Sequence, residues 1–314
     1  MRHIWSLDDL FLEGSCVSIG TFDGVHLGHQ EIIRQLVTRA NQTGLPAIVV
    51  TFFPHPDRVL GKKEGRFYLS TPEEKADILA NLGVDIVVTH PFNLEVANLS
   101  AREFLTNLKE KIAFRELVVG YDFALGKKRE GTVQHLAELG LELDFELHVI
   151  PPVRVNGEIV SSSYLRSLLG EGNIAKVNAL LGRPFFLSGK VIPGDGRGRS
   201  LGIPTANLDI LAERAVPLHG VYVCYAIVNH QRYGAVVNVG VRPTFESEPV
   251  APRVEAHLLD FEADLYQEVL ALEFLDRLRD ERRFPSKDAL VEQIQRDILQ
   301  ARQVLSSMVP EQKD

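Results

Sequence analysis

The chain is poor in sulfur: its 314 residues include two cysteines and two methionines. Cys16 and Cys224 lie far apart, each inside an apolar run, and they form no Cys-x-x-Cys pair. This spacing argues against a disulfide framework and against a cysteine zinc site. We interpret both residues as reduced thiols in the protein core, in a reducing compartment.

Long apolar runs are also missing. No segment reaches the roughly 18 apolar residues of a membrane span, and the charged stretch from Met1 to Leu12 does not resemble a signal peptide. The formal net charge of -8 disfavours general binding to nucleic acid or anionic membranes, because phosphate contacts give such binding its affinity. We therefore expect a cytoplasmic protein with no nucleic-acid or membrane partner. No oligomeric state is predicted.

Short β-branched runs alternate with amphipathic helical patterns in the first half of the chain. Two helix starts carry capping boxes, Thr71 with Glu74 and Ser100 with Glu103. Repeated strand–helix–strand units predict a parallel sheet with helices on both faces, a Rossmann-like domain whose ligands bind at the carboxyl ends of the strands. Strands are expected at 16–20, 47–53, 84–89, 117–120 and 145–150, and helices at 28–41, from 72, from 101, at 161–169 and at 174–181.

The pattern changes after Pro184, where strand-like runs follow one another with turns between them. These runs, at 187–192, 221–228, 233–239, 253–259 and 269–278, predict an antiparallel β-barrel, and Ser286 opens a terminal helix. We therefore expect two domains, residues 1–183 and 184–314, as the chain length suggests.

A glycine-rich loop, residues 20–29, joins the first predicted strand to the first helix. A helix start attracts phosphate, and glycines at 20, 24 and 28 let a polyphosphate approach the backbone. His26 and His29 are one helical turn apart, so both can face one ligand as imidazolium ions or as neutral N–H donors. The alternatives are a structural turn with two surface histidines and, with no third ligand at metal spacing, a zinc site.

A second glycine-rich loop, residues 189–202, lacks the Walker spacing of a P-loop. Thr205 and Asn207 follow it in an extended segment, so their side-chain oxygens point the same way. Both are hard oxygen ligands of the kind that suits Mg²⁺. The alternative is an ordinary polar turn.

The first loop, GTFDGVHLGHQ, carries an HxGH sequence and resembles the adenylyltransferase half of bacterial bifunctional riboflavin kinase/FAD synthetases. The segments TFFPHP (51–56), VGYDF with GK (119–127) and SSSYLR (161–166) resemble further motifs of that family. The resemblance implies that the catalytic groups include His26, His29 and Arg166. It also implies ATP binding by Gly20, Phe22, Asp23, Gly24, Gly28, Ser161 and Ser162, and flavin binding by His55, Asp122 and Phe123.

The second half resembles the riboflavin kinase module, whose pattern GxVxxGxxxGRxLGxPTAN matches residues 189–207 and is followed here by VEAH at 254–257. The resemblance implies that Glu255 is the base that removes a proton from the ribityl hydroxyl. It further implies ATP binding by Lys190, Gly194, Gly198 and Arg199, metal binding by Thr205 and Asn207, and flavin binding by Arg282 and Phe284.

The combined resemblance covers nearly the whole chain and implies two reactions that both consume ATP with Mg²⁺. Riboflavin would be phosphorylated to FMN in the second domain, and FMN would be adenylylated to FAD in the first, with release of pyrophosphate. Three alternatives remain at this stage: a monofunctional riboflavin kinase, a non-catalytic flavin or nucleotide sensor, and a transferase acting on another phosphorylated vitamin.

Overall fold

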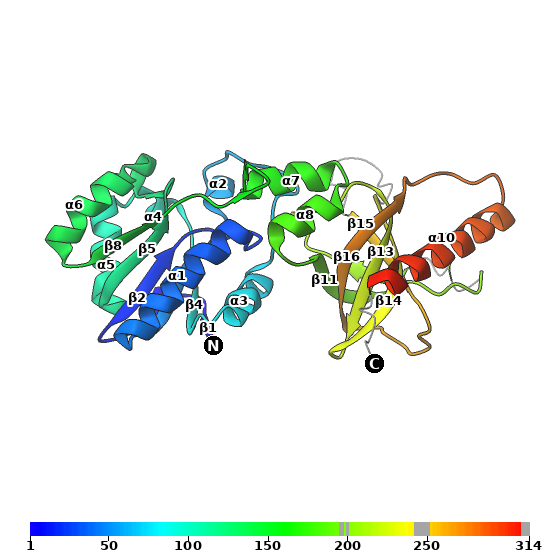
Figure 1. Cartoon of the computed structure of the whole chain (residues 1–314), viewed down its shortest axis with the longest axis horizontal. Coiled ribbons are helices and arrows are strands. Elements are labelled where there is room, and N and C mark those ends of the chain that lie inside the picture. Colours follow the sequence, from blue (N-terminus) through cyan, green and yellow to red (C-terminus); the bar gives the residue numbers. More distant parts are fainter. Residues whose placement is uncertain (195–197, 199–200, 242–251, 309–314) are drawn as a thin grey trace. The chain divides into compact units, whose positions relative to one another are not determined.

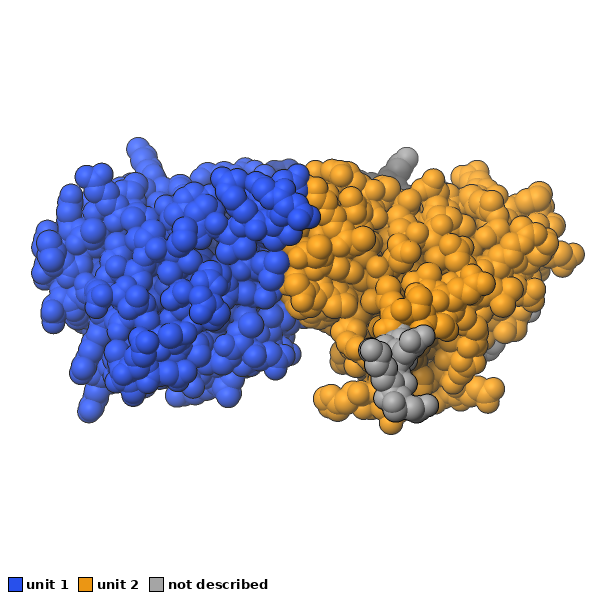
Figure 2. Space-filling model, viewed as in Figure 1, with its two compact units in different colours: residues 1–162 blue, residues 163–314 orange. Residues whose placement is uncertain are grey.

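The computed structural model describes all residues except 195–197, 199–200, 242–251 and 309–314. Arg199, expected to bind ATP, therefore lies outside the described residues. The chain divides into two compact units, Met1–Ser162 and Ser163–Asp314, which Figure 2 shows in separate colours. The boundary predicted at 183 and 184 falls next to the first barrel strand, which begins at Phe185.

The first unit is built on a six-stranded sheet in the order β1-β4-β3-β2-β5-β8 (Figure 1). Every pairing in this sheet is parallel, which confirms the Rossmann-like arrangement expected from the sequence. The strands are β1 (Arg2–Ile4), β2 (Ser15–Ile19), β3 (Ala47–Phe53), β4 (Ile86–Pro91), β5 (Phe114–Gly120) and β8 (Glu146–Ile150). Of these six strands, β1 alone has no counterpart among the strands expected from the sequence.

Helices cover both faces of this sheet. On one face, α1 (Leu27–Thr43) and α3 (Pro72–Asn81) pack on Cys16, Val49 and Val87. On the other face, α5 (Ala101–Ile112) and α6 (Val133–Leu143) pack on alternate residues of the same strands. Because side chains alternate along a strand, neighbouring residues of one strand supply two separate cores.

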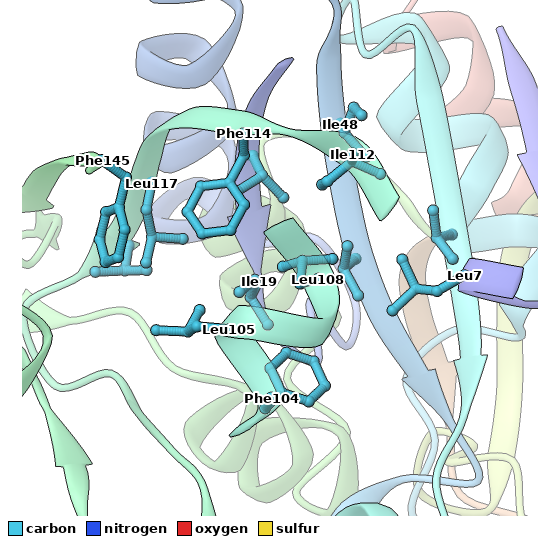
Figure 3. Close-up of a cluster of buried hydrophobic side chains, with 14 of the residues drawn as sticks. Leu7, Ile19, Ile48, Phe104, Leu105, Leu108, Ile112, Phe114, Leu117 and Phe145 are labelled. Carbon is cyan, nitrogen blue, oxygen red and sulfur yellow. The ribbon is translucent and has the colours of Figure 1, made fainter. Parts of the chain in front are cut away.

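Figure 3 shows the core beneath α5, where Phe104, Leu105 and Leu108 meet Ile19 and Leu117 of the sheet. Burial of each such side chain contributes about 1.5–3 kcal/mol. Both predicted capping boxes are present, at Thr71 and Ser100. Shorter elements complete the unit: η1 (Leu7–Asp9), α2 (Pro56–Val59), α4 (Leu94–Asn98), β6 (Ala124–Leu125), η2 (Lys127–Arg129), β7 (Gly131–Thr132), β9 (Arg154–Val155) and β10 (Glu158–Ile159).

The second unit begins with two helices, α7 (Ser162–Gly170, whose first residue belongs to the first unit) and α8 (Ile174–Leu181). A closed antiparallel barrel follows, in the order β11-β12-β15-β14-β13-β16, which confirms the predicted barrel. Its strands are β11 (Phe185–Ile192), β12 (Ala206–Asp209), β13 (Gly220–Val228), β14 (Gln231–Val241), β15 (Pro252–Leu258) and β16 (Val269–Arg279). The terminal helix α10 (Lys287–Met308) packs its apolar side, including the fully buried Ala301, on β13, β14 and β16.

Candidate active sites

The first loop lies where the strand order of the parallel sheet reverses. From β2 the chain passes to β3 on one side, while β5 lies on the other. In open α/β sheets such a switch point leaves a crevice at the carboxyl ends of the two strands. The loop after β2 and the loop after β5, which holds Asp122 and Phe123, therefore share one edge of the sheet.

His26 is the N-cap of α1 and is almost completely buried. Its Nδ1 accepts a hydrogen bond from the backbone N–H of His29, at 3.3 Å. A neutral imidazole that accepts through Nδ1 carries its proton on Nε2, so that nitrogen is a donor. Gly28 leaves room for this ring, because a Cβ there would lie 3.1 Å from it.

His29 stacks on His26, with ring centroids 3.6 Å apart and an angle of 15° between the planes. The rings of Phe22 and His29 form a T-shaped pair, with their centroids 5.2 Å apart. Burial, and then the charges of His26 and Lys75, hold the pKa of His29 well below its usual range. His29 is therefore neutral at pH 7, and its buried Nδ1 has no hydrogen-bond partner among the residues that the structure describes. The structure thus favours the neutral donor over the imidazolium ion for this residue.

Asp23, expected to contact ATP, uses its buried carboxylate inside the protein. It accepts hydrogen bonds from the backbone N–H groups of Leu69, at 2.9 Å, and Ser70, at 3.2 Å. The backbone oxygen of Asp23 accepts from the Ser162 hydroxyl at 2.9 Å. The structure therefore connects Asp23 and Ser162, and it gives the carboxylate of Asp23 a role in holding the loop.

The Pro-His-Pro turn is connected to the same loop through residues 67–70. His55 caps α2, and its backbone N–H donates to the Tyr68 hydroxyl at 3.0 Å. The His55 ring meets Phe67 edge to face at 4.7 Å. Because Asp23 binds the adjacent Leu69 N–H, one segment connects the expected flavin turn with the expected ATP loop.

The other residues predicted for the first site, Asp122, Phe123, Ser161 and Arg166, lie on the loop after β5 and on or next to α7. Phe123 is partly buried against the core, and Asp122 is exposed, with its carbonyl accepting from Arg129 at 3.1 Å. Ser161 precedes α7, and Arg166 lies on α7 in the second unit.

The second site is a cavity of about 460 Å³ in the barrel unit. Its walls bring together seven of the residues predicted for the kinase site: Gly194, Gly198, Thr205, Asn207, Glu255, Arg282 and Phe284. Lys190 lies on β11, is exposed, and is not among the residues that line this cavity.

Three polar residues of this cavity form a row across neighbouring strands. Asn207 on β12 lies directly opposite Glu255 on β15, and Glu255 lies directly opposite Asn238 on β14. Residues that face each other across antiparallel strands project on the same side, with Cβ atoms about 4.5–5.5 Å apart. Sheet register alone therefore puts the predicted base beside a predicted metal ligand.

The side chain of Asn207 is buried, and its Oδ1 has no hydrogen-bond partner in the described part of the chain. An oxygen left this way costs free energy unless a ligand satisfies it. Gly194 lies against it so closely that a Cβ would come within 2.1 Å of the Asn207 amide nitrogen. Gly198 is equally constrained, because a Cβ there would lie 2.4 Å from the carbonyl oxygen of Ile203. Only glycine fits these two positions without a shift.

Glu255 has a charged neighbour that the sequence did not single out. Arg253 donates to the Glu255 carboxylate at 2.6 Å, and both side chains are about four-fifths buried. His257, the next residue on this face of β15, donates from Nδ1 to the carbonyl of Pro204 at 2.8 Å. Arg253, Glu255 and His257 alternate with the buried residues Val254, Ala256 and Leu258. This alternation is a sequence signal that could have identified Arg253 and His257.

Arg282 and Phe284 are attached to α10 through a polar network. The Arg279 guanidinium binds the carboxylate of Asp297, which is buried, at 2.7–3.0 Å. The ring of Phe284 lies near two guanidinium groups, 4.9 Å from that of Arg282 and 5.7 Å from that of Arg279. Further residues of the cavity wall that sequence reasoning did not identify are Tyr266, Arg279, Glu281 and Asp297.

Among the described residues, no group of three or more His, Cys, Asp or Glu side chains is placed to hold a metal ion. None of the described helices is both long enough and apolar enough to span a membrane.

Comparisons with known proteins match each half of the chain to a family. Residues 9–164 match the family described as FAD synthetase, and residues 181–305 match the family described as riboflavin kinase. Proteins named bifunctional riboflavin kinase/FMN adenylyltransferase are similar over nearly the whole chain. That of Bacillus subtilis is 36% identical, covering 94% of this chain and 93% of the relative, and that of Escherichia coli K12 is 35% identical, covering 99% of each.

A solved structure from Streptococcus pneumoniae, titled as a macrolide-efflux protein, matches with a TM-score of 0.84 and 31% identity. The match covers 96% of this chain and 98% of that one. The two family matches follow the order of the two sites along the chain. The chain therefore belongs to the family of bifunctional riboflavin kinase/FMN adenylyltransferases.

Proposed function

We propose that the chain phosphorylates riboflavin to FMN in the barrel cavity and adenylylates FMN to FAD at the first loop. The observation that carries this proposal is the contrast between the two sites. The barrel cavity places a carboxylate, Glu255, beside an unsatisfied amide oxygen of Asn207. The first loop instead presents a helix start and two stacked histidines. We propose residues 1–183 and 184–314 as the corresponding functional modules.

In the kinase reaction, the ribityl hydroxyl oxygen attacks the γ-phosphorus of ATP and ADP leaves. Glu255 accepts the hydroxyl proton, because an alcohol is a poor nucleophile until its proton is taken. Arg253 holds the carboxylate in place through their 2.6 Å contact. The oxygen of Glu255 that receives the proton must therefore be one that Arg253 leaves accessible.

The donor set of this cavity fits Mg²⁺. The Asn207 Oδ1 is buried and unsatisfied, and the Thr205 hydroxyl belongs to the same cavity. Both are hard oxygen ligands, and Mg²⁺ completes its shell with water and substrate phosphates. A Mg²⁺ ion held by these residues would neutralise charge at the transferring phosphate. Gly194 and Gly198 allow the phosphates to lie close to the backbone. We propose Lys190 as a further ATP contact.

Apolar and aromatic groups also line this cavity, and we propose that they bind the flavin ring. Phe284 and Arg282 offer a stacking surface, and Leu201, Ile203, Leu290 and Ile294 line the same space. Flat heteroaromatic rings bind well between such groups.

In the transferase reaction, a phosphate oxygen of FMN attacks the α-phosphorus of ATP and pyrophosphate leaves. A phosphate monoester has a second pKa of about 6, so FMN is already a nucleophile at neutral pH and needs no general base. Catalysis then rests on positioning and on donors for the developing charge. We propose that these groups are the side chains of His26, His29, Ser161, Ser162 and Arg166, together with the loop backbone at Gly20, Phe22, Asp23, Gly24 and Gly28.

His55, Asp122 and Phe123 are proposed to hold FMN at this first site. Their loops follow β3 and β5, the two neighbours of β2, at the carboxyl edge of the sheet. We propose a cytoplasmic location, because the two buried cysteines are free thiols and both reactions use ATP.

ATP labelled at one phosphate tests the two reactions separately. With riboflavin and Mg²⁺, label from the γ-phosphate is expected in FMN and in the FAD made from it. Label from the α-phosphate is expected in FAD alone. FMN without FAD, even when FMN itself is supplied, would favour a monofunctional kinase. Tight flavin binding without any transfer of label would favour a sensor.

A further inference from the structure

Lys75 of α3 has no role in the reactions described above, yet it is almost completely buried at the first loop. Its Nζ donates to the carbonyl oxygen of Thr21, at 2.7 Å, and to the hydroxyl of Thr51, at 3.0 Å. The Thr51 hydroxyl in turn donates to the same Thr21 carbonyl at 3.0 Å. Burial of an ammonium group costs free energy, so a lysine in this position needs a reason.

The loop that Lys75 contacts has an unfavourable backbone conformation. Phe22 and Val25 are bulky residues in the left-handed region, with φ of 45° and 41°. Such conformations cost about 1–3 kcal/mol each, and they persist only where the surrounding structure enforces them. The first loop therefore depends on its external contacts for its shape.

Different contacts hold different parts of this loop. Asp23 and Gly24 are held by residues 69–70, through the Asp23 carboxylate and through a bond from the Gly24 N–H to the Ser70 hydroxyl at 3.1 Å. The start of the loop is held instead by Lys75 and Thr51 at the Thr21 carbonyl. Because a trans peptide is planar, fixing that carbonyl also fixes the Phe22 N–H, which points the opposite way.

The charge of Lys75 also reaches the histidine pair, since it is one of the causes that lower the pKa of His29. Burial lowers the pKa of Lys75 itself to about 8, against the opposing influence of the Asp23 carboxylate. The titratable groups that face Lys75 are Asp23 of the loop, His29 of α1 and His3 of β1. Lys75 is thus charged at pH 7 and loses its charge as the pH rises through about 8.

We propose that Lys75 is a positioning residue for adenylyl transfer, which holds the Thr21–Phe22 peptide and supplies a fixed positive charge beneath the loop that receives the phosphates of ATP. This inference rests on the proposed function of the first site. It adds to that site a residue that contacts the loop backbone rather than the substrate.

The test compares Lys75→Met with the matched control Lys111→Met, which removes a lysine from α5 on the opposite face of the sheet. FAD formation from FMN should show kcat/KM about 10²-fold lower in Lys75→Met, because small misplacements of reacting groups cost this much. FMN formation from riboflavin by the same sample should be unchanged, because the kinase cavity lies in the other unit. Thermal unfolding shows whether the unit that carries Lys75 is folded. Lys111→Met should retain both activities. Equal FAD formation by Lys75→Met and wild type would overturn the inference.

The pH profile separates positioning by the charged lysine from a merely structural role. Wild-type FAD formation should fall as the pH rises through about 8, and this fall should be absent in Lys75→Met. Thr51→Val removes one contact of Lys75 but keeps its ammonium group. We therefore expect this variant to form FAD more slowly than wild type and still to lose activity as the pH rises. If Lys75→Met does not fold, Thr51→Val provides the test. A fall that persists in Lys75→Met, or full FAD formation by Thr51→Val, would contradict the inference. If wild-type enzyme makes no FAD from FMN at any pH, the proposed function itself fails.

Discussion

The two glycine-rich loops of this chain differ in what surrounds them. The first loop contains a neutral histidine, His29, and a carboxylate, Asp23, that is occupied with backbone N–H groups, and a buried lysine, Lys75, lies behind it. Beside the second loop, the carboxylate of Glu255 faces the cavity next to the unsatisfied oxygen of Asn207. The difference follows from the two proposed nucleophiles. A phosphate needs only to be placed, whereas an alcohol must also lose a proton.

The largest expected effect comes from the proposed base. Glu255→Gln keeps the shape of the side chain but cannot accept the proton, so FMN formation should fall by about 10³-fold, within the usual range for general bases. FAD formation from added FMN should be unchanged. Rates measured with riboflavin and with FMN separate the two. Glu262→Gln, an exposed change in the same unit, is the control, and normal kinase activity in Glu255→Gln would show that this carboxylate is not the base.

The second largest effect is expected at the adenylyl-transfer site. His29→Ala removes a neutral donor from a buried position, so FAD formation should fall by about 10²–10³-fold, as when one donor to a developing charge is lost. FMN formation should survive. The exposed His135→Ala on α6 controls for loss of a histidine. Equal losses of both activities in His29→Ala would contradict the two-site account.

Both reactions should depend on a divalent metal, but substitution of Asn207 should change the metal requirement of the kinase reaction alone. EDTA should stop both steps, because each handles the phosphates of ATP. Asn207→Ala should raise the Mg²⁺ concentration required for FMN formation by about 10–100-fold and leave that for FAD formation unchanged. Titration of Mg²⁺ against both rates measures this. Kinase activity that persists without divalent metal would overturn the assignment of Thr205 and Asn207.

The smallest effect is expected from the polar network of Arg279 and Asp297 in the wall of the kinase cavity. Asp297→Asn weakens the charged hydrogen bonds to Arg279 and should lower the free energy of unfolding by about 1–3 kcal/mol. Because Phe284 and Arg282 depend on this network for their position, KM for riboflavin should rise more than kcat falls. Thermal unfolding and steady-state kinetics measure the two quantities. A loss of kcat with unchanged KM would place Asp297 nearer to the chemistry than proposed here.

The sequence predicted what local patterns determine. Short stretches of sequence determine the capping boxes at Thr71 and Ser100 and the strand at Ala47–Phe53. The structure contains all three. Helix α6 was missed, since Gly140 interrupts its pattern. That glycine is needed because a Cβ there would lie 2.8 Å from the Phe145 carbonyl oxygen.

Residues whose roles depend on tertiary contacts could not be found this way. Lys75 resembles a solvent-facing residue of an amphipathic helix, and only the folded sheet shows that it reaches Thr21. His26 as a helix cap was equally hidden, because histidine is not among the preferred capping residues. Arg253 and His257 were within reach, since they alternate with buried apolar residues on β15.

Complementation between two damaged chains tests the central claim most directly, which is that two separate sites perform two different chemistries. Glu255→Gln and His29→Ala are each incubated with riboflavin, ATP and Mg²⁺, alone and mixed, and FMN and FAD are followed over time by liquid chromatography. The account predicts little product from Glu255→Gln, FMN alone from His29→Ala, and FMN followed by FAD from the mixture. A mixture that makes no FAD, although Glu255→Gln converts added FMN to FAD, would contradict the independence of the two sites.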